Sequence, residues 1–324
     1  MYYPRVIDDL NKVIKMDCEY APIVLFSYNR KNNTKQVIEA LLENKEALYT
    51  DIIIYSDAPK SEDDICEVNE VRNYIRHLNG FKSVTIVERD ENYGLARNII
   101  EGVTNVVTQF GSVIVLEDDI VVGHYFLAYM NNALRMYEFD TDVMEIVGYL
   151  EPVFTDDLPE SMFIKNGYCW GWATWKNRWD LFSKKPLEAY KSMSIREKYH
   201  FDLEGSVGKT EQILYNVTGV LNTWAVFWDY TIFKNDGYVL VPSRSLVRNI
   251  GGDGSGEHQA DETLNVDGYI DFEVEHFPTT IEENVILRKR ISIWHKGNVW
   301  KKIKRTYYKM LQKCHYIKNV RKFF

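Results

Sequence analysis

The sequence has few cysteines and no long apolar run, and these absences exclude several classes of protein. Its four cysteines are scattered over 324 residues, with neither a CxxC pair nor a regular spacing, which excludes a disulfide framework. No stretch approaches the roughly 20 apolar residues that span a bilayer. The first residues, MYYPRVIDDLNKVIK, lack the basic flank and apolar core of a signal peptide. We therefore expect a protein of the reducing cytoplasm.

Two glycine motifs that bind phosphates are also missing. The first strand-like run ends in SYNRKNN without a glycine, whereas a dinucleotide fingerprint needs a glycine turn between its strand and its helix. The sequence contains no GxxxxGK[ST] either. The glycines at 251, 252, 254 and 256 lie in the second half and precede no obvious helix, so we interpret them as a lid loop. These observations disfavour a Rossmann dehydrogenase and a P-loop enzyme.

The chain does have the composition of a globular protein, with an uneven distribution of charge. Apolar residues make up 45% and charged residues 27%, as in soluble domains. From Arg288 onward there are 13 Lys or Arg and no acid, so with a net charge of −8 the remainder carries about −21. Cations interleaved with Trp and Tyr suit an anionic membrane surface, here the inner face of the plasma membrane. A basic helix packed on the acidic body is the alternative, and we expect no nucleic-acid partner because no recognition module accompanies the charge.

Two hydrophobic periodicities alternate along the first half of the chain. Strand-like runs lie at 22–28, 51–57, 83–89, 112–118 and 143–149, and helical patterns lie at 34–48, 94–110 and 124–139. This alternation predicts an α/β fold with a mostly parallel sheet and helices on both faces. We divide the chain into a nucleotide-sugar-binding half (1–150), an acceptor-binding half with the lid loop (151–284) and a basic helical extension (285–324).

Polar residues follow three of the predicted strands at the point where each strand ends. They are Ser27-Tyr28-Asn29-Arg30, Ser56-Asp57 and Glu117-Asp118-Asp119. Ligands of open parallel sheets bind beyond the carboxyl ends of the strands. We therefore expect a binding site at this edge of the sheet.

The three consecutive acids are the most informative of these residues. In VIVLEDDIVV a run of β-branched residues ends in like charges that repel each other. A divalent cation, Mn²⁺ or Mg²⁺, held by one or two of them and by the oxygens of a diphosphate, would lower that repulsion. Glu117 and Asp119 point to one side of a strand and Asp118 to the other, so only one acid needs to touch the metal. A solvated turn is the alternative.

Several short motifs, taken in their order, resemble those of glycosyltransferases with the GT-A fold. They are SYNR, YSD, NYGLAR, LEDD, YCWGWATWKNRW and PSRSLVRNIG, spread over about residues 20–258. The pattern is similar to bacterial sugar transferases of polysaccharide synthesis and to the N-acetylglucosaminyltransferase I family, whose acidic motif is also E-D-D. Each motif is weak alone, and the order gives the resemblance its specificity.

The resemblance implies roles for individual residues on the donor side. Asp57 would accept a hydrogen bond from the uracil N–H, with a helix-capping role as the alternative. Arg97 would reach the nucleotide or its phosphates. Asp119 would hold the metal, and His258 would be a second ligand or a pyrophosphate contact, unless it is a plain surface residue. The remaining residues would line the base, the ribose or bound water: Ser27, Tyr28, Asn29, Arg30, Glu117 and Asp118.

The reaction implied is an inverting transfer of a hexosyl or N-acetylhexosaminyl group. Its donor would be a UDP-sugar, and its acceptor a hydroxyl of a glycan or lipid-linked glycan in a surface polysaccharide such as a capsule or O-antigen. Inversion needs a carboxylate to take the acceptor proton. N-acetylglucosaminyltransferase I has aspartates after the equivalent of Trp224, whereas this chain has Ala225 and Val226. We therefore consider Asp229, Glu211 and Glu151 as the base, and favour Asp229.

The tryptophans offer a surface on which a sugar could stack, and two alternative functions stay open. Trp170, Trp172 or Trp175 would stack on a sugar, although core packing would account for at least one of them. A sugar-phosphate nucleotidyltransferase is the alternative enzyme, but the G-x-G-x-R loop typical of that class is absent after the first strand. A non-catalytic glycan-binding protein on a degenerate transferase fold is the alternative outside enzymes, suggested by Ala225 and Val226.

Overall fold

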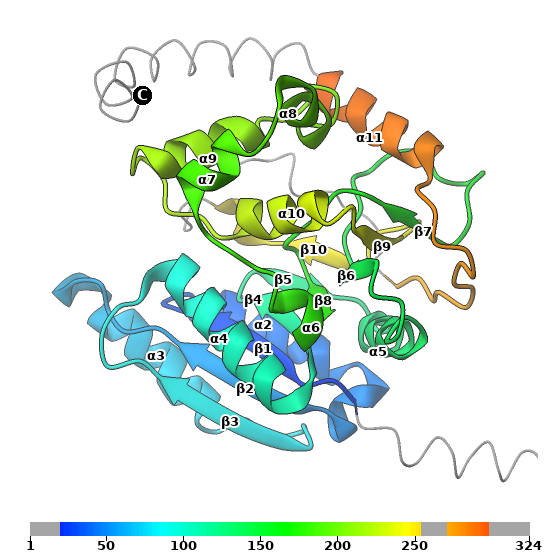
Figure 1. The fold of residues 1–324 in the computed structure, drawn as a ribbon. Coiled ribbons are helices and arrows are strands. Elements are labelled where there is room, and N and C mark those ends of the chain that lie inside the picture. The colour runs from blue at the N-terminus through cyan, green and yellow to red at the C-terminus, as the bar shows by residue number, and fades with distance from the viewer. Residues whose placement is uncertain (1–19, 254–270, 298–324) are drawn as a thin grey trace, which may run out of the picture.

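A computed structural model describes residues 20–253 and 271–297, and an eight-stranded sheet crosses this part of the molecule (Figure 1). Its strand order is β3-β2-β1-β4-β8-β6-β9-β7. The strands are β1 (Ile23–Ser27), β2 (Asp51–Ser56), β3 (Ser83–Glu88), β4 (Ser112–Glu117), β6 (Val143–Val147), β7 (Ser161–Ile164), β8 (Trp172–Trp175) and β9 (Tyr238–Pro242). Only β8 and β7 run antiparallel to their neighbours, so the expected mostly parallel sheet is confirmed.

Helices cover both faces of the sheet, as the alternating pattern predicts. Along β1, Ile23 and Leu25 pack toward one face, whereas Val24 and Phe26 pack toward the other. The first face is covered by α2 (Lys31–Leu42), α3 (Ile65–Ile75) and α5 (Phe126–Met136). The second face is covered by α4 (Gly94–Phe110), α6 (Lys176–Trp179), α10 (Ala225–Lys234) and α11 (Val285–Lys296). Both faces of β1 are therefore buried, which explains its continuous apolar sequence.

The five strands predicted in the first half are confirmed, and α4 has the bounds that its periodicity predicts. The helix predicted over 34–48 differs, because α2 ends at Leu42 and a 3₁₀ helix, Lys45–Tyr49, follows. The Asn44 side chain donates to the carbonyl oxygen of Ala40 and accepts from the backbone N–H of Leu127. These two contacts break the helix and tie it to the start of α5.

The second half contains elements that the sequence patterns do not reveal. YCWGWATW forms β8 in the middle of the sheet. Three short helices, α7 (Pro186–Lys191), α8 (Ile195–Phe201) and α9 (Lys209–Val217), form a layer that packs on α10 through a separate apolar cluster. In Figure 1 this layer lies beyond α10 on the side away from the sheet. Within residues 20–253 and 271–297, no helix has the length and apolar character needed to span a bilayer.

Candidate nucleotide and metal site

The strand-end site is the group of polar residues at the carboxyl ends of β1, β2 and β4, namely Ser27–Arg30, Asp57 and Glu117–Asp119. The parallel register pairs Ser27 with Ser56 and Phe26 with Glu117, so these three strands end at the same edge of the sheet. The structure therefore brings together the three polar groups that the sequence places after separate strands.

The end of β1 has a buried polar atom without a partner. Ser27 is buried, and its Oγ makes no hydrogen bond within the described residues. Such atoms are rare in native proteins. Tyr28 directs its backbone N–H toward Asp118 at 3.4 Å, and its hydroxyl accepts from the backbone N–H of Lys60 at 2.9 Å. Asn29 reaches Asp64 at 3.3 Å. The Ser27 hydroxyl is thus available to a ligand, whereas Tyr28 and Asn29 have partners of their own.

Asp57 caps helix α4. Its carboxylate accepts the backbone N–H groups of Tyr93 at 2.8 Å and Gly94 at 2.9 Å, at the point where α4 begins. The positive end of the helix dipole favours a carboxylate there. Gly94 has φ +66°, a left-handed conformation that favours glycine. The capping role that the sequence left open is therefore present, although carboxylate oxygens keep capacity for a further donor.

The acidic tip, Glu117–Asp119, is paired with Arg30. One guanidinium nitrogen of Arg30 forms ion pairs with Asp118 and, at 3.0 Å, with Asp119. Burial raises the pKa of Asp118 to about 6 against the opposing effect of Arg30. Burial, followed by the charges of Asp119 and Asp118, raises the pKa of Glu117 to about 8. Within the described residues, the three carboxylates of the tip thus share the ion pairs of a single arginine.

The acidic tip fits a divalent cation by its donor chemistry. All its donors are carboxylate oxygens, which Mg²⁺ and Mn²⁺ prefer, and 16% of the Asp119 side chain is exposed. Among the described residues, no group of three or more His, Cys, Asp or Glu side chains is arranged to hold a metal by itself. This agrees with a Mg²⁺-type site in which one or two carboxylates share the ion with phosphate oxygens. The predicted second ligand, His258, lies outside the described residues.

The three candidate stacking tryptophans have different environments. Trp175 is buried, and its Nε1 donates to the carbonyl oxygen of Leu134 at 3.1 Å. Trp172 is completely buried, with its ring 5.4 Å from Trp224 and 6.0 Å from Trp228. It fills the core, and no face of its ring is left for a sugar.

Trp170 is half-buried. Its chain neighbour Cys169 lies close enough to Glu117 and Asp119 for their charges to add to the effect of burial, which raises the pKa of the Cys169 thiol. Trp170 is therefore the candidate that stays beside the strand-end site.

The carboxylates considered as the base are hydrogen-bonded within the acceptor half. Asp229 accepts from the backbone N–H of Gly167 at 2.9 Å and forms an ion pair with Lys209. Glu151 accepts from the Tyr168 hydroxyl at 2.6 Å and contacts His295 of α11 at 3.0 Å. Asp229 and Glu151 thus both hold the Gly167–Tyr168 turn.

Glu211 and Glu145 complete the carboxylates of this region. Glu211, on α9, accepts from Tyr215 at 3.1 Å. Glu145 of β6, which the sequence did not single out, is completely buried. It accepts from the Tyr168 backbone N–H at 2.9 Å and from Trp228 Nε1 at 2.5 Å. A third carboxylate therefore holds the same turn.

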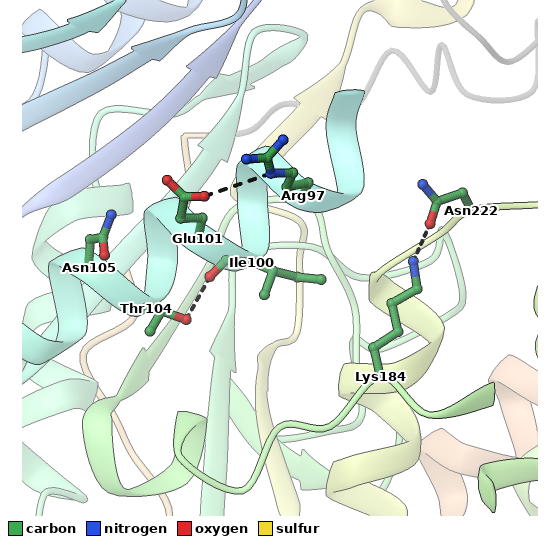
Figure 2. Close-up of a pocket in the computed structure, with 7 residues that line it drawn as sticks. All are labelled: Arg97, Ile100, Glu101, Thr104, Asn105, Lys184 and Asn222. Carbon is green, nitrogen blue, oxygen red and sulfur yellow. Dashed lines mark hydrogen bonds and ion pairs between the residues drawn. The ribbon is translucent and has the colours of Figure 1, made fainter. Parts of the chain in front are cut away.

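Arg97 lies on a separate groove rather than at the acidic tip. Its guanidinium stacks on Tyr93 at 3.5 Å and pairs with Glu91 at 3.1 Å. Figure 2 shows the groove, of about 410 Å³, between one flank of α4 and the side chains of Lys184 and Asn222. The nucleotide contact expected for Arg97 stays a prediction.

Sequence reasoning missed two arginines with buried, unpartnered nitrogen atoms. Arg248 belongs to β10 (Val247–Asn249), which pairs with β5 (Ile120–Val122) directly after the acidic tip. Within the described part of the chain its Nε is buried without a hydrogen-bond partner, as is Nη2 of Arg89, directly after β3. Arg248 lies in the motif PSRSLVRNIG, but only the register of β10 with β5 reveals how close it is to Asp119.

Comparison with known families and structures gives one assignment. The family model described as "Glycosyl transferase family 2" matches residues 23–197, more than half of the chain. The match gives the family and no narrower group within it. A search of the curated proteins returns no match.

The solved structures found by comparison have low sequence identity to this chain and low TM-scores. PcManGT, a mannosyltransferase from Pyrobaculum calidifontis in complex with GDP-Man and Mn²⁺, is 11% identical with a TM-score of 0.36 over 67% of this chain and 69% of that one. Glucosyl-3-phosphoglycerate synthase from Mycobacterium tuberculosis, in complex with Mn²⁺, UDP and glucosyl-3-phosphoglycerate, is 10% identical with a TM-score of 0.32, over 56% and 64%. TarS from S. aureus is 12% identical with a TM-score of 0.29, over 44% of this chain and 23% of that one.

Proposed function

The chain belongs to glycosyl transferase family 2, and from this premise we propose that it transfers a sugar from a UDP-sugar to a glycan or lipid-linked glycan of a surface polysaccharide. The family makes it a nucleotide-sugar glycosyltransferase, and its doubly covered sheet is of the GT-A type. The observation that carries the proposal is the strand-end site. It combines an excess of carboxylates with a buried hydroxyl, Ser27 Oγ, that has no partner.

The donor nucleotide is proposed to lie along the ends of β1 and β2. Ser27, Tyr28 and Asn29 would line the base and ribose, and Asp57 would accept from the uracil N–H while it caps α4. Asp118 would lie near the ribose, and Glu117 would orient bound water. The support is their common edge of the sheet, where ligands of this architecture bind.

The diphosphate is proposed to bind between the acidic tip and nearby arginines. Asp119 would hold Mn²⁺ or Mg²⁺, and such an ion, when bound, supplies positive charge to the departing diphosphate. Arg30 would then exchange its carboxylate partners for phosphate oxygens. Arg248 pairs across the strands with Val121, which lies two residues after Asp119. Its Nε has no hydrogen-bond partner among the described residues. It would be a further phosphate contact.

The transfer itself is proposed to invert the anomeric centre. The bond from the anomeric carbon to the diphosphate breaks, a bond to the acceptor oxygen forms, and a carboxylate takes the acceptor proton. Glu151 follows β6, which is parallel to β4 and reaches the same edge of the sheet, whereas Glu211 and Asp229 lie on α9 and α10. Both Asp229 and Glu151 already have partners at both carboxylate oxygens, so position at the sheet edge is what separates them. Glu151 is therefore our choice of base, in place of Asp229.

Replacing Asp119 tests the nucleotide site. We expect Asp119→Ala to abolish Mn²⁺-dependent binding of UDP, measured by calorimetry, and turnover with it, because the diphosphate loses its link to the protein. Asp142→Ala, which removes an exposed carboxylate after α5, is the matched control and should bind UDP as the wild type does. UDP binding that survives in Asp119→Ala would rule out the metal role. UDP binding without sugar transfer by the wild type would favour a non-catalytic glycan-binding protein.

Replacing Glu151 tests the base. Glu151→Gln keeps the shape of the side chain but removes the proton acceptor. We expect UDP affinity to stay unchanged and the rate constant of transfer to fall by a factor of about 10²–10⁴. Transfer at the wild-type rate would assign the base to another carboxylate, and Asp229→Asn in the same assay would identify it.

The basic extension is proposed to bring the enzyme to the anionic inner face of the plasma membrane. Its described part, α11, packs on the body through Leu287 and Ile291, and Arg290 pairs with Asp157. This is the alternative that the sequence left open for the extension. The opposite side of α11 carries exposed apolar side chains and lysines without any acid: Val285, Ile286, Lys289, Ile293 and Lys296. An apolar and cationic surface of this kind suits anionic lipid.

A further inference from the structure

The groove beside α4 is a second polar site, distinct from the strand-end site. Its volume of about 410 Å³ lies within the range of roughly 300–1,000 Å³ that holds small ligands. Helix α4 begins at Gly94 next to Asp57, and Asn105 lies eleven residues further along it. At 1.5 Å per residue the groove therefore extends about 16 Å from the strand ends along α4.

The two walls of the groove come from the two halves of the chain. Figure 2 shows Arg97, Glu101 and Asn105 on successive turns of α4, with Lys184 and Asn222 on the facing wall. The facing wall is held against α4 because Trp179 Nε1 donates to Thr104 at 2.9 Å. Phe182 stacks on Trp179 with ring centroids 4.6 Å apart and planes 5° from parallel. The groove is thus formed before any ligand binds.

The polar groups in the groove alternate between donors and acceptors. Lys184 donates to the Asn222 side-chain oxygen, and the Asn222 amide N–H₂ has no hydrogen-bond acceptor among the described residues. The Asn105 side chain has no hydrogen-bond partner within residues 20–253 and 271–297. Glu101 provides a carboxylate, and Ile100 a small apolar contact. Two amides, a carboxylate and two cations can all bond to groups that both donate and accept.

A saccharide fits this lining better than other small ligands do. Each sugar hydroxyl both donates and accepts a hydrogen bond, so it matches a mixed set of amides and charged groups. Glu101 pairs with Arg89 at 2.7 Å and lies 3.9 Å from Arg97, so the lining presents carboxylate oxygens beside cationic N–H donors. A single sugar hydroxyl can bond to both kinds of group, whereas a phosphate can only accept.

We propose that the groove between α4 and the Lys184–Asn222 wall is a carbohydrate subsite that holds sugar residues of the acceptor glycan away from the reacting hydroxyl. The inference rests on the proposed function, because it assigns the acceptor class of the same enzyme. Contacts remote from the reaction would hold a growing chain between transfers and add affinity for longer acceptors. Both halves of the chain would then contribute to acceptor binding.

The test fills the groove from α4. Asn105→Trp places a large ring in the groove, and Thr108→Trp places the same ring on an exposed position of α4 that does not line it. Wild type and both variants are applied to an array of immobilised bacterial polysaccharides and oligosaccharides. Apparent affinities are then measured for the glycans that the wild type binds. We expect Asn105→Trp to weaken binding by about tenfold or more, and Thr108→Trp to bind as the wild type does.

Asn222→Ala gives a second reading without added bulk, and thermal unfolding checks that every variant is folded. We expect Asn222→Ala to weaken glycan binding as well, by a smaller factor than Asn105→Trp, because one amide is lost. Wild-type binding that is absent, or equal in Asn105→Trp and wild type, would overturn the subsite. UDP binding by the wild-type protein, measured separately with Mn²⁺, reports on the proposed function. A protein that binds UDP but gives equal glycan binding in both tryptophan variants refutes only the groove.

Discussion

At the scale of single residues, three interior carboxylates around the Gly167–Tyr168 turn serve first to hold that turn. Glu145, Glu151 and Asp229 each accept a hydrogen bond from Gly167 or Tyr168. They come from β6, the segment after it and α10, so the turn is held from three directions. Tyr149 contacts both Tyr168 and Trp170, with ring centroids 5.5 and 4.4 Å away. The carboxylates thus fix the position of the aromatic group beside the acidic tip.

Glu145 leads to a prediction about pH. Burial, aided by the charge of Asp229, raises the pKa of Glu145 well above its ordinary value. In the unfolded chain the Glu145 carboxyl ionises near pH 4.5, whereas in the folded protein it stays protonated to a higher pH. The free energy of unfolding therefore falls as the pH rises above 4.5. We expect the wild type to lose free energy of unfolding relative to Glu145→Gln between pH 5 and 8, by up to about 1.4 kcal/mol per pH unit.

Urea unfolding at pH 5 and at pH 8 measures the difference in free energy of unfolding between the wild type and Glu145→Gln. Glu138→Gln, at an exposed position, is the matched control and should follow the wild type at both pH values. At pH 5 the wild type should be the more stable, because Tyr168 and Trp228 donate to different oxygens of Glu145, and in Gln one of these oxygens is replaced by an N–H₂ group that cannot accept. If the wild type keeps or increases its advantage in free energy of unfolding over Glu145→Gln from pH 5 to pH 8, the raised pKa of Glu145 is contradicted.

At the scale of elements, the short β5–β10 pair joins the PSRSLVRNIG motif to the acidic tip. Asn249 pairs with Ile120, and the backbone N–H of Ile250 donates to the carbonyl oxygen of Asp119 at 2.8 Å. Gly251 follows directly, and a Cβ there would meet the Asp119 carboxylate and, at 3.2 Å, Nη1 of Arg30. The glycine motif therefore contributes backbone that packs on the acidic tip.

Gly251→Ala tests this packing. We expect the Asp119 carboxylate to move aside, and Mn²⁺-dependent UDP binding to weaken by about tenfold or more, since metal sites depend on ligand position. The free energy of unfolding should change by less than about 1 kcal/mol, because the only atoms displaced are the ends of flexible side chains. Unchanged UDP affinity, measured by calorimetry, would show that Asp119 adapts without loss.

At the scale of the whole molecule, α11, the described part of the basic extension, is tied to the acceptor half by ion pairs. Arg288 pairs with Glu204 at 2.9 Å and Glu283 at 3.1 Å, and His295 reaches Glu151 at 3.0 Å. These contacts bind part of the C-terminal positive charge to the acidic body. Nine further Lys and Arg residues follow Gly297, outside the described residues.

A variant that ends at Gly297 separates the two roles of the extension. It keeps α11 and its packing but lacks the last 27 residues. We expect its binding to vesicles with anionic lipid to fall by at least about tenfold, since each cation near such a surface contributes about 1 kcal/mol. Wild-type binding should weaken with added salt and be absent on zwitterionic vesicles. Equal binding by the two proteins would exclude the tail as the membrane contact.

The sequence by itself determined the first half of the fold and the position of the strand-end site. Local periodicity is strong in β1, β2, β4 and α4, and parallel strands bring their carboxyl ends to one edge, so polar residues after those strands had to meet. Only the tertiary structure decided which residues neutralise, cap or bury those polar groups. The pairing of Arg30 with the acidic tip, the burial of Trp172 and the carboxylates around Gly167 depend on contacts between residues far apart in the chain. Such contacts leave no local pattern, because they depend on packing and distance rather than on the spacing of residues along the sequence.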